Sequence, residues 1–205
     1  MPTPATNKIK YGLEKVYIAK QTEQAGVYSY ATPVALPGAV NLSLDAQGES
    51  TPFYADNIVY YRTKGNNGYS GTLEVALIPD WFRTDILNEK EDTNGVLVEN
   101  ANDDEPVYFA MLFEFKGDVK AVRHVMYNCS VTRPSVASST KEASVAPGTE
   151  TLNLTCDPRS DGLVKAKTGA NTDSDEYDGW YTAVYVPEAA SGTNNNSNNN
   201  SGTPS

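Results

Sequence analysis

The fold of this chain is decided by residues 107–131, which read VYFAMLFEFKGDVKAVRHVMYNCSV. Apolar side chains alternate through the first half of this stretch, and successive side chains of a strand point to opposite faces. One face carries Val107, Phe109, Met111, Phe113 and Phe115, and the other carries Tyr108, Ala110 and Leu112. This pattern predicts a strand buried on both sides for part of its length. The turn residues from Lys116 to Asp118 and the apolar run after them predict a β-hairpin between Pro106 and Pro134.

The rest of the chain also favours strands and turns. It contains 13 Tyr, 15 Gly and 12 Pro, and aromatic residues suit pleated surfaces while Gly and Pro interrupt them. Further strands are predicted at residues 15–20, 27–36, 40–44, 58–62, 73–78, 152–156, 163–167 and 177–186. The polar stretch 45–57 contains the aromatic pair Phe53 and Tyr54, and we expect a long loop there with apolar side chains to bury.

One segment has the spacing of a helix instead. Pro79 and Asp80 suit a first helical turn, and Phe82 and Ile86 lie four residues apart on one face. We therefore predict a mainly β protein, a β-sandwich or barrel-forming domain with one short flanking α-helix at about residues 80–89. Residues 1–187 are expected to form this one domain. Residues 188–205 are rich in Asn, Ser and Gly and are expected to be disordered.

The charge and composition exclude several classes of protein. Against 16 Lys and Arg stand 26 Asp and Glu, a net charge of -10, which opposes ordinary nucleic-acid binding. No apolar run approaches the roughly 20 residues of a membrane helix. The first 15 residues hold no apolar stretch of the secretory kind, so folding in the cytosol with reduced cysteines is expected.

The residues that usually carry chemistry do not assemble into a site. His124 is the one histidine and is expected to be structural, and Cys129 and Cys156 are expected to pack in the core. The acidic stretch from Asp173 fails the spacing of a calcium loop, and carboxylate pairs in loops are usually solvated. We therefore predict no catalytic, metal or cofactor site, and a binding or structural protein rather than an enzyme.

Several segments, taken in order, resemble a known family. They are FYADNIVYY at 53–61, the tract from Gly71 to Asp80, NGVLVE at 94–99, residues 108–135, and TETLNLTCDPRSDGLVKAKT at 149–168. Together these segments resemble the major tail protein, or tail tube protein, of phages with long non-contractile tails. The resemblance covers roughly residues 5 to 187.

The resemblance implies a structural virion protein. Members form hexameric rings that stack into the tail tube, and strands of neighbouring subunits join into a barrel around the lumen through which DNA passes at ejection. The implied partners are further copies of the chain, the tape-measure protein and the tail terminator and initiator proteins, with assembly in the host cytoplasm. Neither a membrane nor a cofactor is implied.

Within that role, two groups of residues are candidates for function. Phe53 and Tyr54 are candidate contacts between rings, because aromatic side chains anchor interfaces; the alternative is that they fold back onto their own domain. Candidate acidic residues of the lumen or loops are Asp45, Glu49, Asp56 and Glu74. Six copies at -10 would give a ring a charge of -60, which would repel DNA inside the lumen or serve solubility outside it.

A second function class remains open at this stage. Tyr177, Trp180 and Tyr181 are crowded together, and aromatic faces stack on sugars, so a β-sandwich carbohydrate-binding module is the alternative. Packing of these rings in the core is the simpler explanation.

Overall fold

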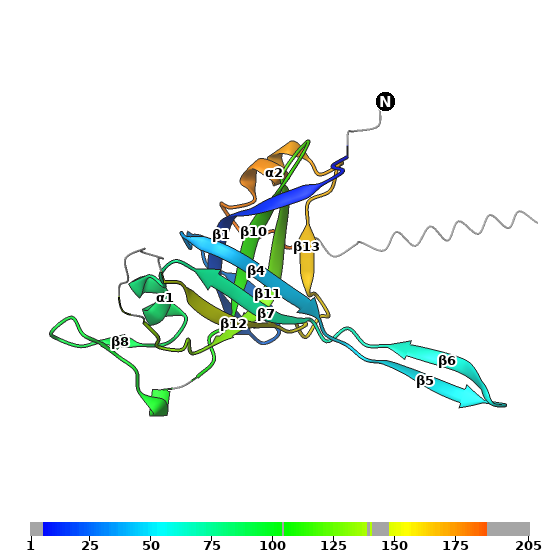
Figure 1. Ribbon diagram of the computed structural model, residues 1–205, viewed down its shortest axis with the longest axis horizontal. Coiled ribbons are helices and arrows are strands. Elements are labelled where there is room, and N and C mark those ends of the chain that lie inside the picture. The colour runs from blue at the N-terminus through cyan, green and yellow to red at the C-terminus, as the bar shows by residue number, and fades with distance from the viewer. Residues whose placement is uncertain (1–5, 104, 139, 141–147, 188–205) are drawn as a thin grey trace, which may run out of the picture.

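The computed structural model of the protein describes residues 6–103, 105–138, 140 and 148–187. Its centre is a nine-stranded, antiparallel sheet in the order β2-β1-β10-β11-β12-β7-β4, with β3 pairing β1 and β13 pairing β11 (Figure 1). The strands are β1 (Lys10–Gln24), β2 (Val27–Tyr30), β3 (Val34–Ala35), β4 (Ala39–Ala46), β7 (Tyr69–Val75), β10 (Phe109–Gly117), β11 (Val122–Thr132), β12 (Glu150–Cys156) and β13 (Lys165–Lys167). The predicted mainly β class is confirmed.

Smaller elements extend from this sheet. They are the pair β5 (Ser50–Ala55) and β6 (Ile58–Lys64), the pair β8 (Lys90–Glu91) and β9 (Leu97–Val98), the helices α1 (Asp80–Asp85) and α2 (Ser174–Gly179), and the 3-10 turn η1 (Ala101–Asp103). No helix of the described residues is long and apolar enough to cross a membrane.

The hairpin predicted from residues 106–134 is present as β10 and β11. Leu112 lies opposite Val125, and Phe113 lies opposite His124. The first six residues of β10, from Phe109 to Glu114, are all buried, as their two-sided apolar pattern predicts.

The two faces of the sheet bury two separate apolar clusters. The larger cluster lies between the halves of the sheet, with Leu73 and Leu152 on one half facing Ile18 and Met111 on the other. Figure 1 shows β4 and β7 crossing in front of β10 and β11, which is a sandwich-like arrangement. The smaller cluster, with Leu112 and Tyr127, lies on the opposite face beneath Trp180.

The predicted flanking helix is present but shorter than residues 80–89. It ends at Asp85, because Asn88 adopts the left-handed region with φ 61 and turns the chain away. Phe82 and Ile86 are buried in the larger cluster, so the expected apolar face is correct. Arg83 ties the helix to β12 through a 3.0 Å contact from its guanidinium to Glu150.

Two predictions about local structure are wrong. Residues 45–57 do not form a long loop, because most of them belong to β4 and to the hairpin of β5 and β6. Residues 177–186 do not form a strand. Residues 177–179 are the last turn of α2, whose first turn is capped by Asp173 through a hydrogen bond that its side chain accepts from the Asp175 backbone N–H, and residues 180–186 have no strand pairing. The predicted disordered tail at 188–205 lies outside the described residues.

Candidate assembly surface

The hairpin of β5 and β6, residues 50–64, projects from the body of the protein, and we call it the arm (Figure 1). Its tip is Asp56-Asn57, with φ 53 and φ 60, and two residues with positive φ make the tight turn that matches strand twist. Phe53 lies opposite Tyr61, and Tyr54 lies opposite Val59. The register shifts between Phe53 and Tyr54, so Tyr60 is the extra residue of a bulge.

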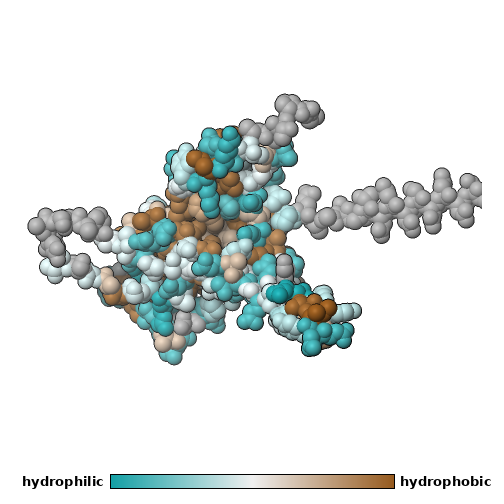
Figure 2. All heavy atoms as spheres, turned by 45° about the vertical axis from the view of Figure 1, so that its right-hand side comes forward, coloured by the Kyte–Doolittle hydropathy of each residue, from teal (hydrophilic) through white to brown (hydrophobic). Residues whose placement is uncertain are grey.

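Apolar and aromatic side chains are exposed all along this hairpin. Their exposed fractions run from 43% to 72% for Phe53, Tyr54, Ile58, Val59, Tyr60 and Tyr61. Figure 2 shows brown apolar atoms on the projecting arm, apart from the rest of the surface. A two-stranded hairpin is marginally stable alone in water, and a contiguous apolar patch marks an interaction site. The arm therefore has the properties of a contact surface.

Both predicted contact residues, Phe53 and Tyr54, lie on the arm, each 62% exposed. They do not fold back onto their own domain. Neighbouring residues of a strand point to opposite faces, so Phe53 and Tyr54 present their rings on the two faces of the arm. The arm can thus be enclosed by a partner on both sides.

The four acidic candidates do not form one cluster. Asp45 lies near the end of β4, Glu49 lies at the root of the arm, and Asp56 lies at its tip. Glu74 lies near the far end of β7, half buried, and accepts a 2.5 Å hydrogen bond from the Thr149 hydroxyl. The structure thus brings Asp45 and Glu49 toward the root of the arm and leaves Glu74 apart.

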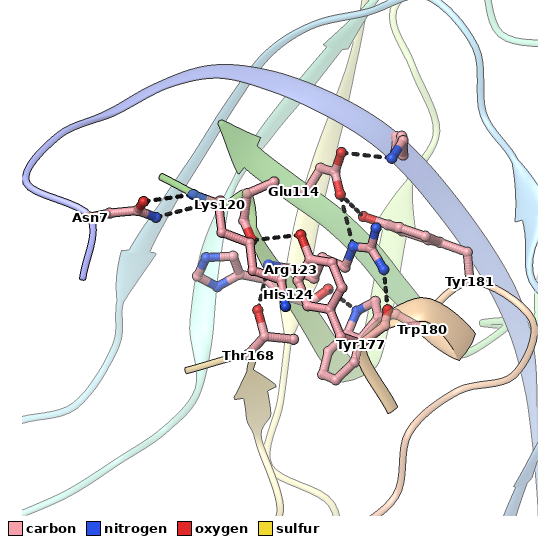
Figure 3. Close-up of polar contacts among 11 residues, drawn as sticks. Asn7, Glu114, Lys120, Arg123, His124, Thr168, Tyr177, Trp180 and Tyr181 are labelled. Atoms are coloured by element: carbon pink, nitrogen blue, oxygen red, sulfur yellow. Dashed lines mark hydrogen bonds and ion pairs between the residues drawn. The ribbon is translucent and has the colours of Figure 1, made fainter. Parts of the chain in front are cut away.

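A buried network of polar side chains, on the face of the sheet that carries the smaller cluster, holds residues 174–187 in place. Glu114 on β10 is 2% exposed and accepts contacts from Lys15 at 3.0 Å, Arg123 at 3.1 Å and the Tyr181 hydroxyl at 3.0 Å (Figure 3). Burial alone would raise the pKa of Glu114, but these hydrogen bonds and the Lys15 charge hold that pKa below its usual value. The carboxylate is therefore ionised in the folded protein at neutral pH.

Arg123 connects this carboxylate to α2. Its guanidinium donates to the Tyr177 carbonyl and lies 3.8 Å from the centre of the Tyr177 ring. The Tyr177 hydroxyl donates to the Ala121 carbonyl at 3.1 Å. Figure 3 shows Arg123, Tyr177 and Tyr181 converging from different elements. The network fixes the segment after β13 against the sheet.

The aromatic residues considered as a sugar-binding surface, Tyr177, Trp180 and Tyr181, instead make contacts within the protein. Trp180 is 3% exposed and stacks on Tyr185 at 5.5 Å, and Tyr181 packs on Tyr17 at 4.8 Å. A ring that stacks on a sugar must present its face to solvent. The observation behind the carbohydrate-binding alternative is therefore explained by core packing.

His124 and the two cysteines are placed as structural residues. The His124 ring stacks on Phe113 at 5.1 Å, and burial together with three lysines lowers its pKa to about 4. Cys129 and Cys156 lie opposite each other on β11 and β12, both fully buried as predicted. Burial raises the pKa of the Cys129 thiol, which makes it a poor nucleophile. Among the described residues no group of three potential metal ligands is close enough to hold an ion.

Sequence reasoning missed two features of this surface. Ile58, Tyr60 and Tyr61 belong to the arm but were predicted only as an ordinary strand; the dipeptide Asp56-Asn57 between two aromatic runs is the signal for a hairpin. Glu114 was missed as the centre of a network, although a single carboxylate within an apolar strand indicates a buried, paired charge.

The chain is similar to a known protein family and to a chain of a solved structure. The model of a family described as phage tail tube protein matches residues 2–149. No curated protein matches the chain. Among solved structures, a chain of the cryo-EM structure of the anti-feeding prophage baseplate is similar, with 12% identity and a TM-score of 0.46. That similarity covers 84% of this chain and 100% of the other.

Proposed function

Because the chain belongs to the phage tail tube protein family, a family of structural tail proteins, we propose that it is the ring-forming subunit of the tube of a long non-contractile tail. In this proposal six copies close into a ring, the rings stack, and phage DNA passes through the lumen at ejection. The tube is built in the host cytoplasm and becomes part of the virion.

The observation that carries this proposal is the exposed arm. Six apolar or aromatic side chains project from the body on two strands that have no further strand partner among the described residues. Exposed strand edges and apolar patches are a hazard in a monomer, and contact with another subunit removes both. The arm therefore supports a role within an assembly.

We further propose that Phe53 and Tyr54 contact the next ring. The arm projects beyond the sheet and presents aromatic rings on both sides, which suits insertion between neighbours. Tape-measure, terminator and initiator proteins are the other partners in this proposal. Residues 1–187 form the tube domain, and residues 188–205 are an appendage that the tube does not need.

The lumen proposal concerns Asp45, Glu49, Asp56 and Glu74. Asp45, Glu49 and Asp56 are exposed, and Glu74 is half buried. Asp45 and Glu49 are the better candidates for the lumen, since they lie near the same end of the sheet. Negative charge there would keep DNA from adhering to the wall.

The test is electron microscopy of the purified protein at increasing concentration, with sedimentation velocity on the same samples. Rings or tubes of uniform diameter are expected. A strictly monomeric protein at every concentration and salt, also in the presence of tail-initiator complexes, would overturn the proposal.

A further inference from the structure

Three lysines gather around His124 on the face of the sheet that carries the larger cluster. Lys167 lies opposite His124, and Lys165 lies opposite Met126, in the pairing of β13 with β11. Residues directly opposite in antiparallel strands point to the same face. The ammonium of Lys10 lies 5.1 Å from the centre of the Phe115 ring, which in turn lies 5.3 Å from the His124 ring. We call Lys10, Lys165 and Lys167 the lysine patch.

The lysine patch is not neutralised by ion pairs among the described residues. All three side chains are exposed, and none takes part in an ion pair within the part of the chain that the structure describes. After burial, the groups that lower the pKa of His124 are these same lysines, with no acidic group opposing them. The acidic helix α2 is followed by Trp180, which packs on the other face of the sheet. In a chain of net charge -10, this concentration of positive charge calls for an anionic partner.

The patch also adjoins the arm. The Lys165 ammonium lies 4.3 Å from the centre of the Tyr69 ring and donates to its hydroxyl. Tyr69 is the first residue of β7, directly after the segment that returns from the arm. The lysine patch and the arm thus belong to one continuous side of the protein.

The opposite charge is concentrated in residues 80–105, which we call the acidic excursion. Nine carboxylates stand there against two basic side chains, a net -7 of the chain's -10. Asp85, Glu91 and Glu105 are exposed and make none of the ion pairs of the described residues. The excursion consists of α1, β8, β9 and η1 outside the nine-stranded sheet. Figure 1 shows α1 and β8 on the left side of the body and β13 on the right.

We propose that the lysine patch of one subunit binds the acidic excursion of a second copy, so that subunits associate head to tail. The inference rests on the proposed self-assembly and specifies its direction. Patches of opposite sign on opposite sides cannot satisfy a symmetric two-fold dimer, whereas they suit the head-to-tail contact that builds rings or filaments. Complementary charge of this kind fixes orientation and register more than it adds affinity.

The experiment uses two full-length variants with reversed charge. The first carries Lys10→Glu, Lys165→Glu and Lys167→Glu, and the second carries Asp85→Lys, Glu91→Lys and Glu105→Lys. All six positions are exposed, and thermal melting verifies that each variant is folded. Each variant alone is expected to need at least tenfold more protein than wild type to assemble, by light scattering and electron microscopy. A mixture of the two is expected to recover assembly, because each reversed side then meets its complement.

Controls separate charge at this patch from charge in general. Lys20→Glu makes the same change at an exposed position ten residues away on β1, about 30 Å along the strand, and is expected to assemble like wild type. A second form of the first variant carries Gln at the same three positions, which removes the positive charges without adding negative ones. It disturbs folding less than the Glu variant does and is expected to weaken assembly less. Higher salt should weaken wild-type assembly, because the Debye length, over which charges act on one another, falls to about 3 Å at 1 M.

The outcomes distinguish this inference from the proposed function. If the wild-type protein never assembles, both the proposed function and the charge pairing are overturned. If wild type assembles and both reversed variants assemble equally well, or if their mixture stays monomeric while each is folded, only the charge pairing is overturned. If the lysine variant assembles normally but loses binding to double-stranded DNA, the patch belongs to phosphate recognition and the inference is wrong.

Discussion

Glu114 lies directly opposite Arg123 across β10 and β11, with 3.1 Å between Oε2 and Nε, and both side chains are almost fully buried. Removing one partner of such a pair leaves the other charge buried without compensation. We expect Glu114→Gln to lower the free energy of unfolding by about 3 kcal/mol, measured by urea denaturation.

Glu14→Gln is the matched control for this prediction. Glu14 lies opposite Glu114 on β1 and pairs with Lys116 at 2.6 Å, but its side chain is 41% exposed. Surface pairs contribute little, so a loss below about 1 kcal/mol is expected. Equal losses for the two variants would show that burial of the Glu114 network does not matter.

His124 makes stability depend on pH between neutral and acid. Its pKa is lowered to about 4 in the folded protein, first by burial and then by Lys167, Lys165 and Lys10. An unfolded histidine titrates near 6.5, so the unfolded state takes up the proton first as the pH falls. The stabilisation that the folded state gains from keeping His124 neutral is therefore complete above about pH 6.5. It is lost progressively as the pH falls toward 4.

We expect stability to drop by about 1 to 2 kcal/mol between pH 7 and pH 4.5 through this group, after allowing for solvent screening. The same denaturation series on His124→Gln measures it, because the variant lacks the titrating ring. A slope over this range that is identical in wild type and variant would contradict the assignment. The lowered pKa of Glu114 adds its own loss only below about pH 4.5.

The sequence predicts the sheet better than it predicts the surface. Alternation in residues 107–131 is a local consequence of burial on two faces, so β10 and β11 could be predicted. The arm was predicted as a loop although Asp56-Asn57 is a hairpin signal, because Pro52 and the same dipeptide also suit a loop. What distinguishes the two is the pairing of Phe53 with Tyr61, which depends on the turn conformation.

The prediction of a strand at residues 177–186 was wrong for a different reason. Aromatic residues between 177 and 186 suit a strand by propensity, but tertiary contacts override propensity. Trp180 fills the smaller cluster, and Arg123 holds Tyr177, so the segment packs through side chains rather than through strand pairing. Asp173 followed three residues later by Glu176 is the capping signal that predicts the helix.

Truncation tests which part of the C-terminus the protein needs for folding and which for assembly. Deleting residues 188–205 is expected to leave both melting temperature and tube formation unchanged, because the packed aromatic residues Trp180 and Tyr185 remain. Deleting residues 174–205 removes Trp180 from the smaller cluster and is expected to cost about 3 to 5 kcal/mol. Loss of tubes in the shorter deletion would show that the Asn-rich tail is itself a contact.

The arm gives the sharpest test of assembly. Phe53 and Tyr54 are each 62% exposed, so replacing both with Ser removes little packing from the body. Burial of each side chain against another subunit would be worth about 2 kcal/mol, and a ring of six would repeat the contact six times. The double variant is therefore expected to melt within a few degrees of wild type and yet to form no stacked rings by electron microscopy. Leu77→Ser is the control, since Leu77 is 69% exposed on the body, and it should assemble normally. A double variant that stacks normally would remove the arm from the axial contact, and one that melts tens of degrees lower would place the two rings in the domain's own stability.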